Sequence, residues 1–300
     1  MEIRTGTARI DDDLEIYYED IGNPGDPPVL LVMGLGAQLL LWRDGFCERL
    51  VDQGYRVIRY DNRDVGLSSK LHGQRGGGAL VPNLVRSFVG RPSPSVYTLE
   101  HMADDAAALL DHLGIDRAHV VGASMGGMVA QLVAIRHPEL VTTLTSMMSS
   151  TGSPDVGQST PEAFAALMKP MAPDRGGYVA DSVASSRVWA SKRYFDKSSA
   201  SALAAASYDR GLCPEGTTRQ LAAMLATGSL EGDLARLRLP VLVIHGTDDT
   251  LITPSGGQRT AEVIPGAELM IVTDMGHDRP EPLWPILWDA IETHTARVRD

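Results

Sequence analysis

Runs of consecutive apolar residues alternate with stretches of helical spacing along most of the chain. Such apolar runs are typical of strands that are buried on both faces of a parallel sheet. They predict strands at 29–33, 55–60, 118–121, 140–148, 241–245 and 267–272, and helices at 40–50, 99–113, 125–136, 254–264 and 282–298. Two shorter strands are expected within residues 2–20, where apolar and polar positions alternate. Strands and helices that alternate in this way predict an α/β fold with a parallel sheet covered by helices.

Residues 153–233 interrupt this alternation. They contain helical patterns and no clear strand, which predicts an insertion of about four helices. We therefore expect a core domain formed by residues 1–152 and 234–300, and a helical cap formed by residues 153–233. Apolar and aromatic side chains recur in the insertion at helical spacing, and they would either roof a site or attach the cap to the core: Phe164, Leu167, Met168, Met171, Val188, Trp189, Tyr194 and Phe195.

The segment Gly122-Ala123-Ser124-Met125-Gly126 stands between a predicted strand and a predicted helix. Its G-x-S-x-G pattern is typical of a tight turn that holds a serine hydroxyl above the edge of a sheet. Side chains at the two glycines would collide with the neighbouring backbone. Read alone, the segment is also compatible with an ordinary helix start that is capped by a serine.

Two further loops supply the groups that an attacking serine needs. A serine hydroxyl requires a base to take its proton, and an imidazole base requires a carboxylate to orient it. Asp249 and His277 each follow a predicted strand, which gives the chain order Ser, Asp, His. The adjacent Asp248 must point in a different direction and is expected to cap the turn. We therefore predict that Ser124, Asp249 and His277 form a catalytic triad.

Other histidines are assigned structural roles. His245 is expected to pack against the sheet edge, and His137 precedes a proline and is expected to cap a helix. His101 and His112 fall on the solvated face of a predicted helix. Of these candidates, only His277 follows a Met-Gly turn at the exit of a strand.

The oxyanion that forms during acyl transfer needs two backbone N–H donors. Met125 follows the serine at the start of a helix and is the first predicted donor. The second must come from the loop after the strand 29–33, where we choose Leu35 over its neighbour Gly34. The run Gly76-Gly77-Gly78 follows the wrong strand for an oxyanion loop and is interpreted as a flexible loop.

Composition narrows the remaining possibilities. The chain has 300 residues, and a hydrophobic content of 43% is ordinary for a globular protein. The net charge of -11 argues against nucleic-acid binding. It shows no signal-peptide core and no apolar run long enough to span a membrane, so we expect a cytoplasmic protein. Cys47 and Cys213 form no metal-binding spacing and are expected to be free thiols. No cofactor or metal is predicted, and a monomer and a homodimer both stay open.

Taken together, these motifs resemble the α/β-hydrolase fold superfamily. The matching segments are Met33-Gly34-Leu35-Gly36, Asp61-x-Arg63-x-x-Gly66-x-Ser68, Gly122-x-Ser124-x-Gly126-Gly127, Gly246-x-x-Asp249 and Gly276-His277. Within the superfamily, the chain is similar to aclacinomycin methylesterase-type and bacterial lipase/esterase members, through the segments Leu31–Gly34, Arg59–Asp64 and His119–Gly126.

The resemblance implies a sheet of about eight mostly parallel strands, with a helical cap inserted after the sixth. It also implies the same triad and the same two oxyanion donors. Many relatives have His-Gly where this chain has Met33-Gly34, but the donors are backbone groups and the oxyanion hole is expected to survive. The Asp61–Ser68 loop is interpreted as structural, with Arg63 and Asp64 pairing locally.

The leading functional hypothesis is hydrolysis of a small, apolar carboxylic ester through an acyl-enzyme. A thioester is a close alternative, because the same site handles both. Cleavage of a C–C bond, lyase activity and cofactor-free perhydrolase activity are further possibilities on this fold, and a non-enzymatic ligand receptor is a remote one. A serine at position 124 argues against dehalogenase and epoxide hydrolase chemistry, which would need a carboxylate there.

Overall fold

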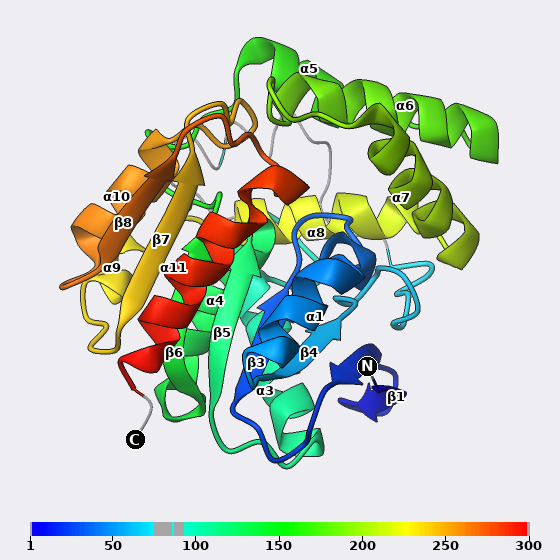
Figure 1. Cartoon of the computed structure of the whole chain (residues 1–300). Coiled ribbons are helices and arrows are strands. Elements are labelled where there is room, and N and C mark those ends of the chain that lie inside the picture. The colour runs from blue at the N-terminus through cyan, green and yellow to red at the C-terminus, as the bar shows by residue number, and fades with distance from the viewer. Residues whose placement is uncertain (1, 75–85, 87–92, 299–300) are drawn as a thin grey trace.

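The computed structural model describes residues 2–74, 86 and 93–298, and an eight-stranded sheet lies at its centre (Figure 1). The strands follow the spatial order β1-β2-β4-β3-β5-β6-β7-β8. Their bounds are β1 (Ile3–Arg9), β2 (Glu15–Ile21), β3 (Pro28–Val32), β4 (Arg56–Tyr60), β5 (Ala118–Ala123), β6 (Val141–Met147), β7 (Val241–Gly246) and β8 (Glu268–Val272). β2 pairs antiparallel with both β1 and β4. The remaining neighbours in the sheet, β4-β3-β5-β6-β7-β8, pair in parallel. The carboxyl ends of the parallel strands therefore meet at one edge, where sites in such sheets form.

Helices cover both faces of this sheet, so its central strands β3, β5, β6 and β7 are buried along almost their whole length. On one face lie α1 (Asp44–Asp52) and α11 (Trp284–Ala296), and on the other lie α3 (Leu99–His112) and α4 (Met125–Arg136) (Figure 1). Each face has its own buried apolar cluster. α10 (Ser255–Val263) connects β7 to β8. The predicted α/β fold is confirmed.

The predicted insertion lies between the sixth and seventh strands. It contains α5 (Pro161–Met168), α6 (Arg175–Trp189), α7 (Lys197–Arg210) and α8 (Pro214–Thr227), followed by the short α9 (Glu231–Leu234). In Figure 1, α5 to α8 lie across the carboxyl edge of the sheet. The division of the chain into a core and a cap domain at these residues stays a prediction.

The helix expected at 40–50 is divided into the 3-10 turn η1 (Leu39–Leu41) and α1. The reason is that distant side chains use the backbone carbonyls at the break. Arg279 donates from Nη2 to the Leu41 carbonyl at 2.8 Å, and Arg59 donates to the Trp42 carbonyl. Similarly, the helix expected at 282–298 begins with the 3-10 turn η3 (Glu281–Leu283) before α11.

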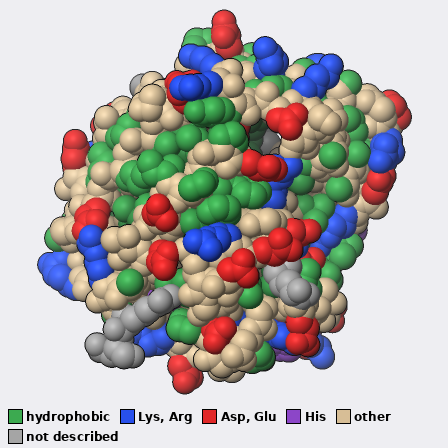
Figure 2. Space-filling model, viewed as in Figure 1, with side chains coloured by type: hydrophobic (Ala, Val, Ile, Leu, Met, Phe, Trp, Pro, Cys, Tyr) green, Lys and Arg blue, Asp and Glu red, His purple; other side chains and the backbone are tan. Residues whose placement is uncertain are grey.

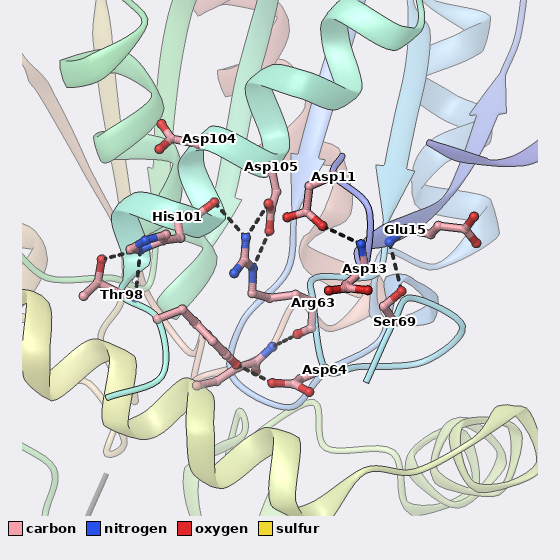
Figure 3. A network of polar contacts seen from close by, with 12 residues as sticks. Asp11, Asp13, Glu15, Arg63, Asp64, Ser69, Thr98, His101, Asp104 and Asp105 are labelled. Carbon is pink, nitrogen blue, oxygen red and sulfur yellow. Dashed lines mark hydrogen bonds and ion pairs between the residues drawn. The ribbon is translucent and has the colours of Figure 1, made fainter. Parts of the chain in front are cut away.

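The loop after β4 corrects one expectation, because Arg63 and Asp64 do not pair with each other (Figure 3). Arg63 forms a bidentate salt bridge with Asp105 on α3, with Nη2 donating to Oδ1 at 2.5 Å and Nε donating to Oδ2 at 2.6 Å. Asp64 has a φ of 71° and accepts two hydrogen bonds from Arg219 on α8, at 2.6 and 2.8 Å. The left-handed backbone at Asp64 separates the two side chains, and the loop thus joins α3 of the core to α8 of the insertion.

The cysteines, the helix lengths and the charged side chains of the described residues bear on several other expectations. Cys47 and Cys213 are free thiols, and burial raises the pKa of Cys47 to about 12. Within the described ranges, no helix is long and apolar enough to cross a membrane, and no cluster of three or more His, Cys, Asp or Glu side chains could hold a metal. On the face shown in Figure 2, Lys and Arg side chains are interspersed with Asp and Glu. The run Gly76–Gly78 lies outside the described residues.

Candidate active site

Four of the parallel strands deliver the predicted site residues to the same edge of the sheet. Leu35 follows β3, Ser124 follows β5, Asp249 follows β7 and His277 follows β8. Because these strands are parallel, loops that are far apart in the sequence converge there.

Ser124 lies in a backbone conformation that non-glycine residues rarely adopt. Its φ and ψ are 59° and -129°, between the last residue of β5 and the first of α4. A Cβ at Gly122 would lie 2.1 Å from the Gly126 carbonyl oxygen, and one at Gly126 would lie 2.3 Å from the Val32 carbonyl oxygen. The two glycines therefore permit a turn that no larger residue would allow, and such strain is characteristic of functional sites.

Asp249 and His277 form a hydrogen-bonded pair, with 2.7 Å between Asp249 Oδ2 and His277 Nδ1. The other carboxylate oxygen accepts the N–H groups of Leu251 and Ile252, both at 2.9 Å. A carboxylate can only accept, so Nδ1 carries the proton and Nε2 is left as the basic atom. The backbone bonds fix the carboxylate, and the carboxylate in turn fixes the ring.

The charge of Asp249 is stabilised although the residue is buried. Burial by itself would raise the pKa of Asp249, but the His277 and His245 rings together lower it to about 2. His245 is fully buried, and its Nε2 lies 3.4 Å from Asp249 Oδ2 and 2.8 Å from the Ile252 carbonyl oxygen. His245 therefore supports the carboxylate, a contact that its position in the sequence did not indicate.

Asp248 has a different environment from Asp249. Its side chain accepts a 3.3 Å hydrogen bond from the Thr247 hydroxyl, and its N–H donates to the Met275 carbonyl.

Within the described part of the chain, the hydroxyl of Ser124 is not hydrogen-bonded to the His277 ring. Contacts of this kind are often long in a ligand-free site and tighten when substrate binds.

The two predicted oxyanion donors are available. The N–H groups of Leu35 and Met125 have no hydrogen-bond acceptor among the described residues. Gly34 brings the Leu35 loop against the nucleophile turn, because a Cβ at Gly34 would lie 2.9 Å from the Ser124 Cβ. Backbone donors at such a place stabilise negative charge on a reacting oxygen.

α8 fixes the loop that carries Leu35. The buried Gln220 accepts the Gly36 N–H on Oε1 and donates from Nε2 to the Arg63 carbonyl, both at 2.8 Å. Gly36 has a φ of 62°, and a Cβ there would lie 2.7 Å from the Thr217 Oγ1. Sequence reasoning did not select Gln220, because no local pattern marks a contact between residues 184 positions apart.

Replacing Gln220 with leucine should lower kcat for ester hydrolysis by about tenfold and change KM little, because the Leu35 N–H would lose its fixed position. Steady-state kinetics on one ester would measure both constants. Gln131→Leu is the matched control, since that buried amide bonds Ser146 and Ser150 instead. Equal losses of kcat in the two variants would show that Gln220 acts only through stability.

A cavity of about 540 Å³ lies beside His277 and Leu35. The insertion contributes aromatic walls at Tyr178, Trp189, Tyr194 and Phe195, and the core contributes Leu41, Phe46 and Trp284. Charged side chains also line it, namely Arg43, Asp196, Asp278, Arg279 and Glu281. The volume suits a small organic molecule.

The chain is similar to several known proteins. Residues 27–279 match the family described as the alpha/beta hydrolase fold. Rhodomycin D methylesterases DauP of Streptomyces sp. (strain C5) and DnrP of Streptomyces peucetius are each 30% identical to the chain, covering 95% of it and 96% of their own lengths. A solved structure described as Est816, an N-acyl homoserine lactone degrading enzyme, has a TM-score of 0.70 at 25% identity and covers 95% of this chain and 99% of its own. The chain belongs to the α/β-hydrolase fold family and is a carboxylic ester hydrolase.

Proposed function

We propose that the protein hydrolyses a small carboxylic ester through a Ser124–His277–Asp249 triad and a covalent acyl-enzyme. The observation that carries this proposal is the 2.7 Å pair of Asp249 and His277, which leaves Nε2 as a base at the cavity that Leu35 also lines. The strained turn at Ser124 and the two unbonded N–H groups support it.

In the first half of the reaction, Ser124 Oγ attacks the ester carbonyl carbon while His277 Nε2 takes the hydroxyl proton. The carbonyl electron pair moves to oxygen, where the N–H groups of Leu35 and Met125 stabilise the charge. When the carbonyl re-forms, the bond to the alcohol oxygen breaks. His277 gives its proton to that oxygen, and the acyl group stays on Ser124.

In the second half, His277 takes a proton from water and the hydroxide adds to the acyl carbon. The resulting intermediate collapses, the bond to Ser124 Oγ breaks, and His277 returns the proton to the serine. The carboxylic acid leaves. Throughout both halves, Asp249 remains ionised and stabilises the transient imidazolium.

The substrate we propose is an ester with a mainly apolar acyl group. Its support is the aromatic lining of the cavity together with a volume of about 540 Å³. Two relatives at 30% identity are named as methylesterases, so a methyl ester is the first choice. Such pockets combine apolar walls with a few polar groups that set orientation.

Partition of the acyl group tests the acyl-enzyme. p-Nitrophenyl butyrate and phenyl butyrate should give the same ratio of methyl butyrate to butyrate when methanol competes with water, since both esters form one acyl-enzyme. The products would be measured by gas chromatography. A ratio that changes with the leaving group would exclude a common intermediate, whichever step limits the rate.

A further inference from the structure

The cavity contains a guanidinium with unused hydrogen-bonding capacity. Arg279 lies two residues after His277 and lines the same cavity. Its guanidinium carbon lies 4.1 Å from the centroid of the buried Trp42 ring, and Nη2 donates to the Leu41 carbonyl at 2.8 Å. Stacking and this one bond hold the planar group in place, so its orientation is fixed before any ligand binds.

The other N–H groups of Arg279 have no acceptor among the described residues, and no carboxylate there lies within 4.0 Å of it. The three acidic residues that line the cavity have other contacts. Glu281 pairs with Arg43 at 2.6 Å, and Asp196 accepts the N–H groups of Ser198 and Ser199 at the start of α7.

Asp278 is the acidic neighbour of Arg279 in the sequence and interacts with it electrostatically. Its Oδ1, however, accepts the Ser191 N–H at 2.9 Å, and burial raises the pKa of Asp278. Asp278 thus joins the core to the insertion and is not an ion-pair partner of Arg279.

Four other arginines that are buried or half-buried pair their guanidinium groups with carboxylates. The pairs are Arg59 with Glu19, Arg63 with Asp105, Arg210 with Asp61 and Arg219 with Asp64. Arg279 departs from this pattern, and its burial lowers the pKa of its side chain to about 10. A guanidinium that is largely withdrawn from water is expensive unless it is paired, and the unpaired edge of the half-buried Arg279 indicates a partner that enters from the cavity.

We propose that Arg279 is a binding subsite for a carboxylate carried by the ester substrate, so that the preferred substrate is a half-ester of a dicarboxylic acid. This rests on the proposed function, because it uses the same cavity. Leu41, Phe46 and Trp284 provide apolar walls for a hydrocarbon spacer between the ester and the carboxylate. The free edge of a guanidinium can bind both oxygens of one carboxylate.

A series of monomethyl dicarboxylates, from succinate to suberate, tests the subsite against neutral methyl esters of matched length. In the wild type, kcat/KM for at least one half-ester should exceed that of its neutral match by about 10- to 100-fold, as a charge-assisted hydrogen bond allows. Arg279→Gln should reduce the ratio of kcat/KM for that half-ester to kcat/KM for its neutral match to about one, and Arg279→Lys should retain part of the preference. Arg193→Gln is the control, since Arg193 pairs with Asp274 at an exposed site.

Calorimetry in the Ser124→Ala background separates this proposal from the catalytic one. The preferred half-ester should bind there more weakly by about 10- to 100-fold once Arg279→Gln is added. Hydrolysis of that ester by Ser124→Ala would contradict the nucleophile and leave the binding result intact. The subsite itself is overturned if no half-ester is preferred, or if Arg279→Gln and Arg193→Gln shift the preference equally.

Discussion

Replacing Ser124 with alanine should reduce kcat/KM for ester hydrolysis by about four orders of magnitude or more, since the acyl group would have no oxygen to which it could transfer. The fold should persist, because the removed hydroxyl makes no hydrogen bond to the described residues and alanine occupies less space. KM should change much less than kcat. Steady-state hydrolysis of a p-nitrophenyl ester, with the thermal unfolding midpoint measured alongside, would show both effects.

Ser198→Ala supplies the control for that change. Ser198 is an exposed serine in the first turn of α7; its backbone N–H donates to Asp196, and its hydroxyl makes no hydrogen bond to the described residues. This variant should retain full activity. Activity in Ser124→Ala above about one hundredth of the wild-type value would contradict the assignment, because water-assisted background catalysis is far slower than that.

Asp249→Asn should lower kcat by about three to four orders of magnitude. An amide that donates toward Nδ1 would favour the opposite tautomer of His277, and it would no longer stabilise the imidazolium. The pKa of Asp249 is lowered to about 2, so its support of His277 is present at neutral pH and is lost only as the pH falls through that value. The loss in the variant should therefore be large across the neutral range, as a pH–kcat profile would measure.

The adjacent Asp248→Asn is the matched control for Asp249. It changes the same charge one residue away, at a side chain that contacts Thr247 only weakly. Activity should stay within about threefold of the wild type, as for a surface substitution away from the reacting groups. Equal losses at 248 and 249 would mean that the loop is sensitive to charge in general and that Asp249 has no special role.

Much of the fold could be predicted because strands that are buried on both faces of the sheet contain runs of apolar residues. β3 is apolar at every position and β7 is apolar from Val241 to Ile244, and each is followed by a loop with polar or small residues. The positions of Ser124, Asp249 and His277 after strands could be read in the same way. Parallel strands convert that shared position in the chain into proximity in space.

Contacts between distant segments could not be predicted. The break between η1 and α1 depends on Arg59 and Arg279, which no helical pattern at 40–50 records. Arg63 and Asp64 were expected to pair locally, yet Arg63 pairs with Asp105 on α3 and Asp64 pairs with Arg219 on α8. Gln220 acquires its surroundings only when the insertion and the core meet, and Arg279 contacts Leu41 and Trp42 only when distant parts of the core come together, so single-sequence patterns gave no signal for either residue.

The central claim is that Ser124 is the nucleophile, and mapping a covalent adduct tests it most directly. The protein would be treated with a fluorophosphonate, digested and sequenced by mass spectrometry. We predict one adduct per chain, on the peptide that contains Ser124, with slower labelling in Asp249→Asn. An adduct on a different residue, or unchanged labelling of Ser124→Ala, would contradict the account.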